Sequence, residues 1–146
     1  MPKRAPYVKP PKSQIPRIQG LRDYVEKHFG HFDFKEVRYI RPGTSVYKSI
    51  SEMQQKLGRL GEDEELGGCC GRLPTGEVVV YLVNRHKRGH GLPFDGLLYE
   101  MIHLAKPDLN PEDVEHKMEE HFDSALKHAS VFAYNATHKR KKPYPK

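Results

Sequence analysis

The stretch Phe94-Asp95-Gly96-Leu97-Leu98-Tyr99-Glu100-Met101-Ile102-His103-Leu104-Ala105 decides the fold of this chain. At 100° per residue, its aliphatic side chains fall on one side of a helix and Tyr99, Glu100 and His103 fall on the other. The spacing therefore predicts a helix with one face in the core. The opposite face is predicted to carry a phenol, a carboxylate and an imidazole.

The pentapeptide Tyr-Glu-x-x-His at residues 99–103 differs by one residue from His-Glu-x-x-His. In that motif two imidazoles one helical turn apart bind zinc, and the intervening Glu activates a water molecule. Glu100 is therefore a candidate catalytic base and His103 a candidate metal ligand. The residue that departs from the motif, Tyr99, stands where a ligand is required.

Length and composition restrict the class of protein. A chain of 146 residues suits one domain with tails, and a net charge of +6 favours an acidic partner such as nucleic acid. The only cysteines, Cys69 and Cys70, are adjacent, which argues against a disulfide-stapled secreted fold. The sequence shows neither a signal peptide nor an apolar run of the roughly 20 residues that span a bilayer. We expect an intracellular protein without membrane contact.

The N-terminal part of the chain is rich in proline and basic residues. Residues 1–19 contain five prolines and five Lys or Arg, which predicts an extended, polyproline-like arm. Periodicity and turn signals then predict a helix over 18–29, a strand over 32–40, a helix over 45–60 and strands over 66–71 and 77–84. The β-branched density of the last strand predicts that it is buried on both faces.

A second long helix is predicted after the central one. Asn110 is a good helix cap, Pro111 suits the first turn, and the periodic pattern continues to about residue 132. His121 and His128 are predicted to share a face of this helix, which His116 joins only partly. Residues 134–146 form a basic tail. We therefore predict a single domain over 20–133 between the arm at 1–19 and this tail.

The order of these elements from about Leu66 to His121 resembles the SprT-like zincins. In that family the helix equivalent to 94–105 carries His-Glu-Met-x-His, and a His-Gly pair before the next helix supplies the third zinc ligand. This chain has Leu109-Asn110 at that place. The resemblance implies an α+β fold: a small mixed sheet packed against a zincin-type central helix, with flanking helices and extended basic and proline-rich tails.

The resemblance also assigns roles to individual residues. Glu100 takes the place of the water-activating carboxylate, His103 that of the second zinc ligand and Tyr99 that of the first. A catalytic zinc needs three protein ligands, so one recognisable ligand is too few. Tyr99 together with His116 or His121 could rebuild a site. We expect no cofactor, with zinc as the alternative.

Basic segments are the candidate partner-binding residues, because clustered cations suit phosphate or an acidic protein surface. They are Arg85, His86, Lys87, Arg88, His90, Lys139, Arg140, Lys141 and Lys142.

These features favour a non-catalytic structural or adaptor subunit that docks through its tails into a large, possibly symmetric assembly. Small SprT-like proteins occur among phage-encoded proteins, so the resemblance implies a virion component, for instance at the head-to-tail connection, and a cytoplasmic or virion location. One alternative is a SprT-type zinc peptidase that acts on DNA-associated proteins. The other is a nucleic-acid-binding module without sequence preference.

Overall fold

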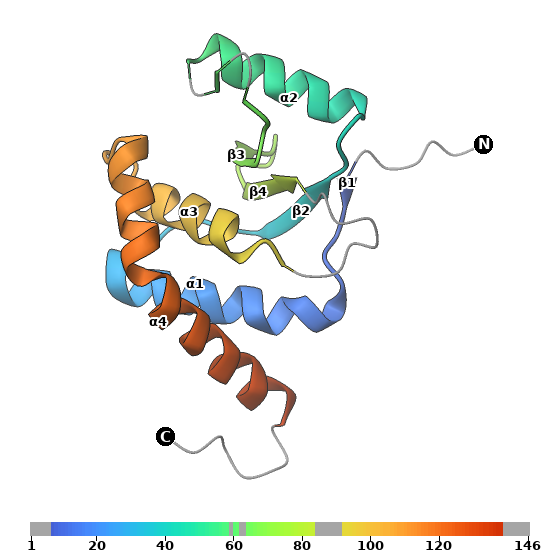
Figure 1. The fold of residues 1–146 in the computed structure, drawn as a ribbon. Helices are drawn as coiled ribbons and strands as arrows, with labels where there is room; N and C mark the ends of the chain where they lie inside the picture. Colours follow the sequence, from blue (N-terminus) through green and yellow to red (C-terminus); the bar gives the residue numbers. More distant parts are fainter. Residues whose placement is uncertain (1–6, 59, 62–63, 84–91, 139–146) are drawn as a thin grey trace, which may run out of the picture. The chain divides into compact units, whose positions relative to one another are not determined.

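The computed structural model describes residues 7–58, 60–61, 64–83 and 92–138. The predicted basic loop at 85–90 and the basic cluster at 139–142 lie outside these residues. The described residues carry four α-helices and a mixed four-stranded sheet, which confirms the predicted α+β class (Figure 1). In chain order the elements are β1 (Tyr7–Val8), the 3-10 helix η1 (Lys12–Gln14), α1 (Ile15–Phe29), β2 (Glu36–Ile40), α2 (Ser45–Lys56), β3 (Gly68–Arg72), β4 (Val78–Val83), α3 (Phe94–Ala105) and α4 (Pro111–Thr137).

The chain divides into two compact units. The sheet unit comprises residues 1–10 and 34–93, and the helical unit comprises residues 11–33 and 94–146. All four strands and α2 belong to the sheet unit, whereas η1, α1, α3 and α4 belong to the helical unit.

Strand β4 lies inside the sheet, whose order is β1-β2-β4-β3. It pairs in parallel with β2 and antiparallel with β3, so Val80 stands opposite Val37 on one side and Cys70 on the other. Val79 and Val80 are both fully buried. Because successive strand residues point to opposite faces, the predicted burial on both sides is confirmed.

Arg38 attaches the N-terminal strand to the rest of the sheet. β1 pairs antiparallel with the end of β2, and the Arg38 guanidinium carbon lies 4.4 Å from the centroid of the Tyr7 ring. The Arg38 Nε also lies 3.3 Å from an oxygen of Glu36. A cation over an aromatic face is an attractive contact, so residues 7–8 of the predicted extended arm are held as a strand of the sheet.

Helix α2 is formed without burying any of its residues. Thr44 precedes it, and the hydroxyl oxygen of Thr44 accepts a hydrogen bond from the Tyr47 N–H at 3.2 Å. The helix ends at Lys56, before the predicted residue 60, and Gly58 follows with φ of 71°. A left-handed glycine just beyond the last turn is a common way to end a helix.

The helical unit consists mainly of three helices. α4 packs against both α1 and α3, and α1 also contacts α3 (Figure 1). Gly20 of α1 lies so close to α4 that a Cβ there would be 2.8 Å from the Phe132 Cβ and 2.9 Å from the Ala129 Cα. The fully buried large side chains of this unit are Leu21, Val25, Leu97, Leu98, Met101, Ile102 and Val114.

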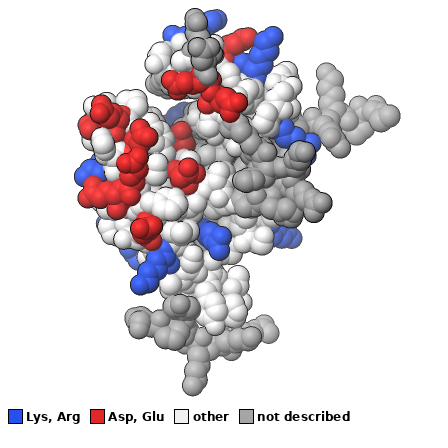
Figure 2. Space-filling view, in the orientation of Figure 1, with Lys and Arg blue, Asp and Glu red and all other residues white. Residues whose placement is uncertain are grey.

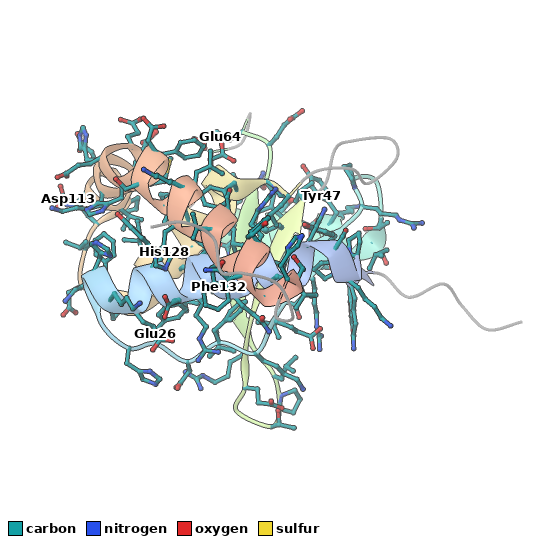
Figure 3. The ribbon with its side chains drawn as sticks, turned by 90° about the horizontal axis from the view of Figure 1, so that it is seen from below. Glu26, Tyr47, Glu64, Asp113, His128 and Phe132 are labelled. Carbon is teal, nitrogen blue, oxygen red and sulfur yellow. The ribbon has the colours of Figure 1, made fainter. Side chains whose placement is uncertain are left out.

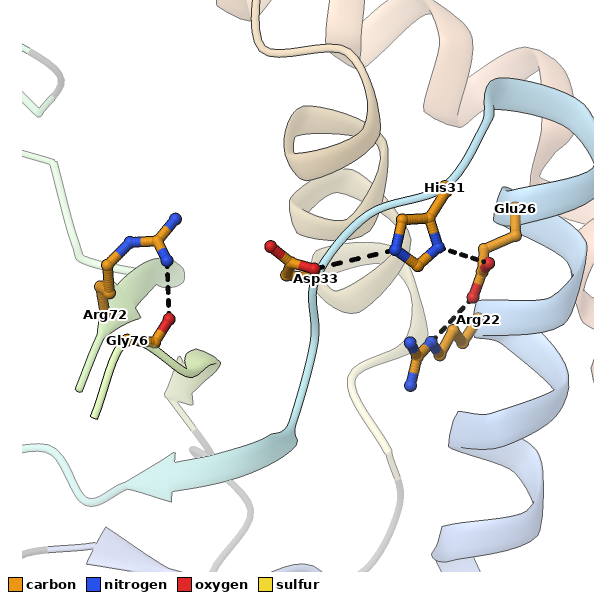
Figure 4. Close-up of polar contacts among 6 residues, drawn as sticks. All are labelled: Arg22, Glu26, His31, Asp33, Arg72 and Gly76. Carbon is orange, nitrogen blue, oxygen red and sulfur yellow. Dashed lines mark hydrogen bonds and ion pairs between the residues drawn. The ribbon is translucent and has the colours of Figure 1, made fainter. Parts of the chain in front are cut away.

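Helix α1 begins earlier than predicted. It starts at Ile15 with Pro16 in its first turn, a position where proline loses no helical hydrogen bond. The predicted extended arm is therefore wrong for residues 12–19. At the other end the Gly30 N–H donates to the Glu26 carbonyl, and the Glu26 side chain lies 3.1 Å from the Nδ1 of His31 (Figure 4).

Helix α4 begins as predicted and ends later. The side-chain oxygen of Asn110 accepts a hydrogen bond from the Asp113 N–H at 2.8 Å, which confirms the predicted cap. The helix continues to Thr137, so residues 134–137 are helical where the basic tail was predicted to begin. None of the described helices combines the length and the apolar character needed to cross a membrane.

Candidate functional site

The three polar residues of α3 differ in burial. Leu97, Leu98 and Met101 are fully buried, as the periodicity predicts, but Glu100 is only 8% exposed. The prediction that this carboxylate lies on a face away from the core is therefore wrong. Tyr99 and His103, on either side of it, are half-buried.

Tyr99 is held in its neutral form. Burial raises the pKa of its phenol, and the negative charges of Glu100 and Glu115 raise it further. A phenol binds zinc only as the deprotonated phenolate, and the pKa of an unperturbed phenol is already near 10. Its surroundings in the helical unit therefore make Tyr99 a poorer ligand than the sequence alone indicated.

The two histidines that could have completed the site lie apart from one another. His116 has a 69% exposed side chain, and its Nε2 is 4.0 Å from a carboxylate oxygen of Glu112 in the first turn of α4. His121 contacts α1, where its Nδ1 lies 2.8 Å from the Tyr24 hydroxyl. One imidazole thus faces solvent while the other takes part in helix packing.

A zinc site is not assembled by these side chains. Across the described part of the chain, no three His, Cys, Asp and Glu side chains are grouped so that they could hold a metal ion. A catalytic zinc requires three protein ligands and an open position. The residues present do not fit the metal that the resemblance implies, and the geometry does not identify His116 or His121 as ligands.

The structure instead brings histidines together where α1 meets α4. Tyr24 lies at the centre with 4% of its surface exposed. The ring of His28, one turn along α1, stacks on it at 3.9 Å, and the ring of His128 lies 5.6 Å from it. Phe29 contacts the His121 ring edge-on at 4.8 Å. We call Tyr24, His28, Phe29, His121 and His128 the histidine cluster.

An ion pair flanks the histidine cluster. The Nε2 of His128 lies 2.8 Å from an oxygen of Asp23, and Lys27 Nζ lies 3.0 Å from the same oxygen. Figure 3 shows His128 on the side of α4 that meets α1. Burial would raise the pKa of the Asp23 carboxyl, but the hydrogen bonds from His128 and Lys27 outweigh it and lower that pKa. Asp23 therefore remains ionised beside His128 and Lys27.

His121 has the opposite preference. Burial lowers its pKa below the usual value near 6.5, and the positive charges of His28 and Lys117 act in the same direction. Glu120 opposes them. The neutral imidazole is therefore favoured at the contact with Tyr24.

Sequence reasoning found only part of this cluster. The spacing predicted that His121 and His128 share a face, and both contact Tyr24. Tyr24 and His28 also stand four residues apart on the apolar side of the helix predicted over 18–29, which was the available signal. Their pairing with residues about a hundred positions later has no local signature.

Comparison with known proteins adds no relative. No family model, curated protein or solved structure matches the chain.

Proposed function

We propose that this chain is a non-catalytic adaptor or structural subunit that binds other proteins within a larger assembly. In this proposal α3 and α4 are a degenerate SprT-like zincin helix pair, with Tyr99 in place of a ligand. The observation that carries the proposal is the position of His121, whose imidazole contacts Tyr24 and Phe29 of α1. A side chain used in helix packing does not serve a metal site with Tyr99 and His103.

Helix α2 supports a protein-binding role. Its apolar residues Val46, Ile50, Met53 and Leu57 recur at spacings of four, three and four, so they form one stripe along the helix. Met53 is 58% exposed and Leu57, just after the last turn, is 56% exposed. Val46 and Ile50 are half-buried, so the C-terminal part of the stripe is the exposed part. An amphipathic helix with a partly exposed apolar stripe is a common protein-recognition element.

The specific version of this proposal is a virion component, for instance at a head-to-tail connection. This version is based on the resemblance to phage-encoded SprT-like proteins, that is, on analogy between folds. The basic segments at 85–90 and 139–142 would add contacts to an acidic protein surface or to nucleic acid.

Metal analysis tests the non-catalytic part of the proposal. We expect the purified full chain to hold far less than one zinc per chain, and we expect His103→Ala to leave that content unchanged. The zinc content of Tyr99→His should be measured alongside, because this variant restores the His-Glu-x-x-His motif. One zinc per wild-type chain that is lost in His103→Ala would overturn the proposal in favour of the peptidase.

Site-specific photo-cross-linking tests the adaptor part. A photoreactive amino acid placed at Met53 in the full chain, in the cells that naturally make it, should cross-link to a discrete protein partner. Lys48 is the matched control, because five residues along a helix place it on a different face of α2. Equal cross-linking from both positions would refute a partner bound on the apolar stripe.

A further inference from the structure

The histidine cluster joins α1 to α4 through imidazole and aromatic rings. The ring centroids of His28 and His121 are 5.7 Å apart, and both rings contact Tyr24. Histidine is the side chain whose charge changes between about pH 5 and pH 8. Acidification would therefore place a positive charge on His121 within the contact between α4 and α1.

The immediate surroundings offer little compensation for a charge on His121. The groups that act on His121 are Tyr24 and His28 of α1 and Lys117 and Glu120 of its own helix. Glu120 is the one carboxylate among them, and Lys117 is a further cation. Phe29 and the buried Tyr24 supply apolar and aromatic surface around the ring. A charge that enters such a contact loses hydration without gaining an equivalent partner.

The other end of the cluster is held by a polar contact. The Nε2 of His128 on α4 lies 2.8 Å from a carboxylate oxygen of Asp23 on α1. Along α4, His121 and His128 are about two turns apart. Acid therefore weakens the contact at the His121 end, whereas the Asp23–His128 contact lies about two turns away.

We infer that the α1–α4 contact is a proton-responsive joint. Protonation of His121 beside His28 loosens the C-terminal end of α1, while the Asp23–His128 contact keeps the middle of α1 packed against α4. The joint responds to mild acidification and needs no ligand. It is independent of the proposed adaptor function, because it requires only the geometry of the helical unit.

The direction of the pH dependence follows from linkage. Because His121 is neutral more readily in the folded chain than in the unfolded chain, the unfolded chain takes up the proton first as the pH falls. The contribution of His121 to stability is therefore complete above its unfolded pKa near 6.5 and is lost at lower pH.

Urea unfolding of the full chain at about pH 7.5 and about pH 5.5 tests the joint. His121→Asn removes the titration but keeps a side-chain acceptor near the Tyr24 hydroxyl. His116→Asn makes the same change at an exposed position of the same helix. We expect the fall in urea midpoint on acidification to be smaller in His121→Asn than in wild type, and unchanged in His116→Asn. An identical fall in all three proteins would overturn the inference.

An NMR titration of the wild-type chain keeps the test decisive if His121→Asn does not fold. The His121 ring should titrate below pH 6.5, and the backbone amides of residues 26–29 should shift with the same midpoint. Amides that do not follow the His121 titration, or a His121 midpoint at or above 6.5, would refute the joint.

Discussion

Replacing Gly20 by alanine should destabilise the helical unit, although alanine is the better helix former. An added Cβ would lie 2.8 Å from the Phe132 Cβ, 2.9 Å from the Ala129 Cα and 3.1 Å from the Ala129 carbonyl oxygen. Non-bonded carbon atoms prefer separations of about 3.5–4.0 Å. The nearest atoms are backbone or Cβ atoms that no rotamer change can move, so α1 and α4 must separate by about 0.7 Å or more.

Whether Gly20→Ala lowers or raises the free energy of unfolding depends on two opposing contributions. Overpacking a well-filled contact costs about 1–3 kcal/mol, whereas exchanging glycine for alanine inside a helix gains about 1 kcal/mol. We expect a net loss of up to about 2 kcal/mol in the free energy of unfolding. Urea unfolding followed by circular dichroism measures it. The neighbouring exposed change Gln19→Ala is the control and should stay within about 0.5 kcal/mol of wild type. A Gly20→Ala protein that is more stable than wild type by the roughly 1 kcal/mol that alanine gains inside a helix would refute the close helix contact.

Two further predictions concern the cap of α4 and a buried phenol. Asn110→Ala should cost about 1 kcal/mol in urea unfolding, because the Asp113 N–H loses its acceptor, whereas Asn110→Asp keeps that acceptor and should cost much less. A large loss in both variants would contradict the cap. Burial raises the pKa of Tyr39 to about 12, above the usual value of 10.0, so this tyrosine stabilises the fold below pH 10 and that contribution is lost as the pH rises toward 12. Ultraviolet titration of wild type and Tyr39→Phe should assign the late-ionising phenol to Tyr39. A wild-type titration without a late step would contradict its burial.

The sequence predicted what local patterns control. The helix at 94–105, the strand that became β4 and the cap at Asn110 each have their signal within a few residues, and all three are present. The start of α1 was missed because Pro16 was counted as part of an extended arm, although proline also suits the first turn of a helix.

The candidate site was less predictable, because tertiary contacts define it. Periodicity placed Glu100 opposite the aliphatic face, but packing in the folded chain leaves it 8% exposed. From the sequence, His121 was a possible metal ligand. The contact between α1 and α4 shows instead that its imidazole lies against Tyr24. A motif defines which chemistry is available, whereas the neighbours of each side chain determine whether it is used.

The distribution of charge distinguishes the adaptor proposal from the nucleic-acid alternative. The chain has a net charge of +6, yet the first half of α4 exposes acidic side chains, which gather over this helix in Figure 2. These residues are Glu112, Asp113, Glu115, Glu119, Glu120 and Asp123.

A phosphate backbone would be repelled by this half of α4, so nucleic acid would have to bind elsewhere, for instance through the basic segments at 85–90 and 139–142. A protein partner can use the apolar stripe of α2 independently of those segments. Removing residues 139–146 should therefore leave cross-linking from Met53 intact. If the same truncation abolished both that cross-link and salt-dependent binding to duplex DNA, the partner would be held by the basic tail and the adaptor proposal would lose its support from α2.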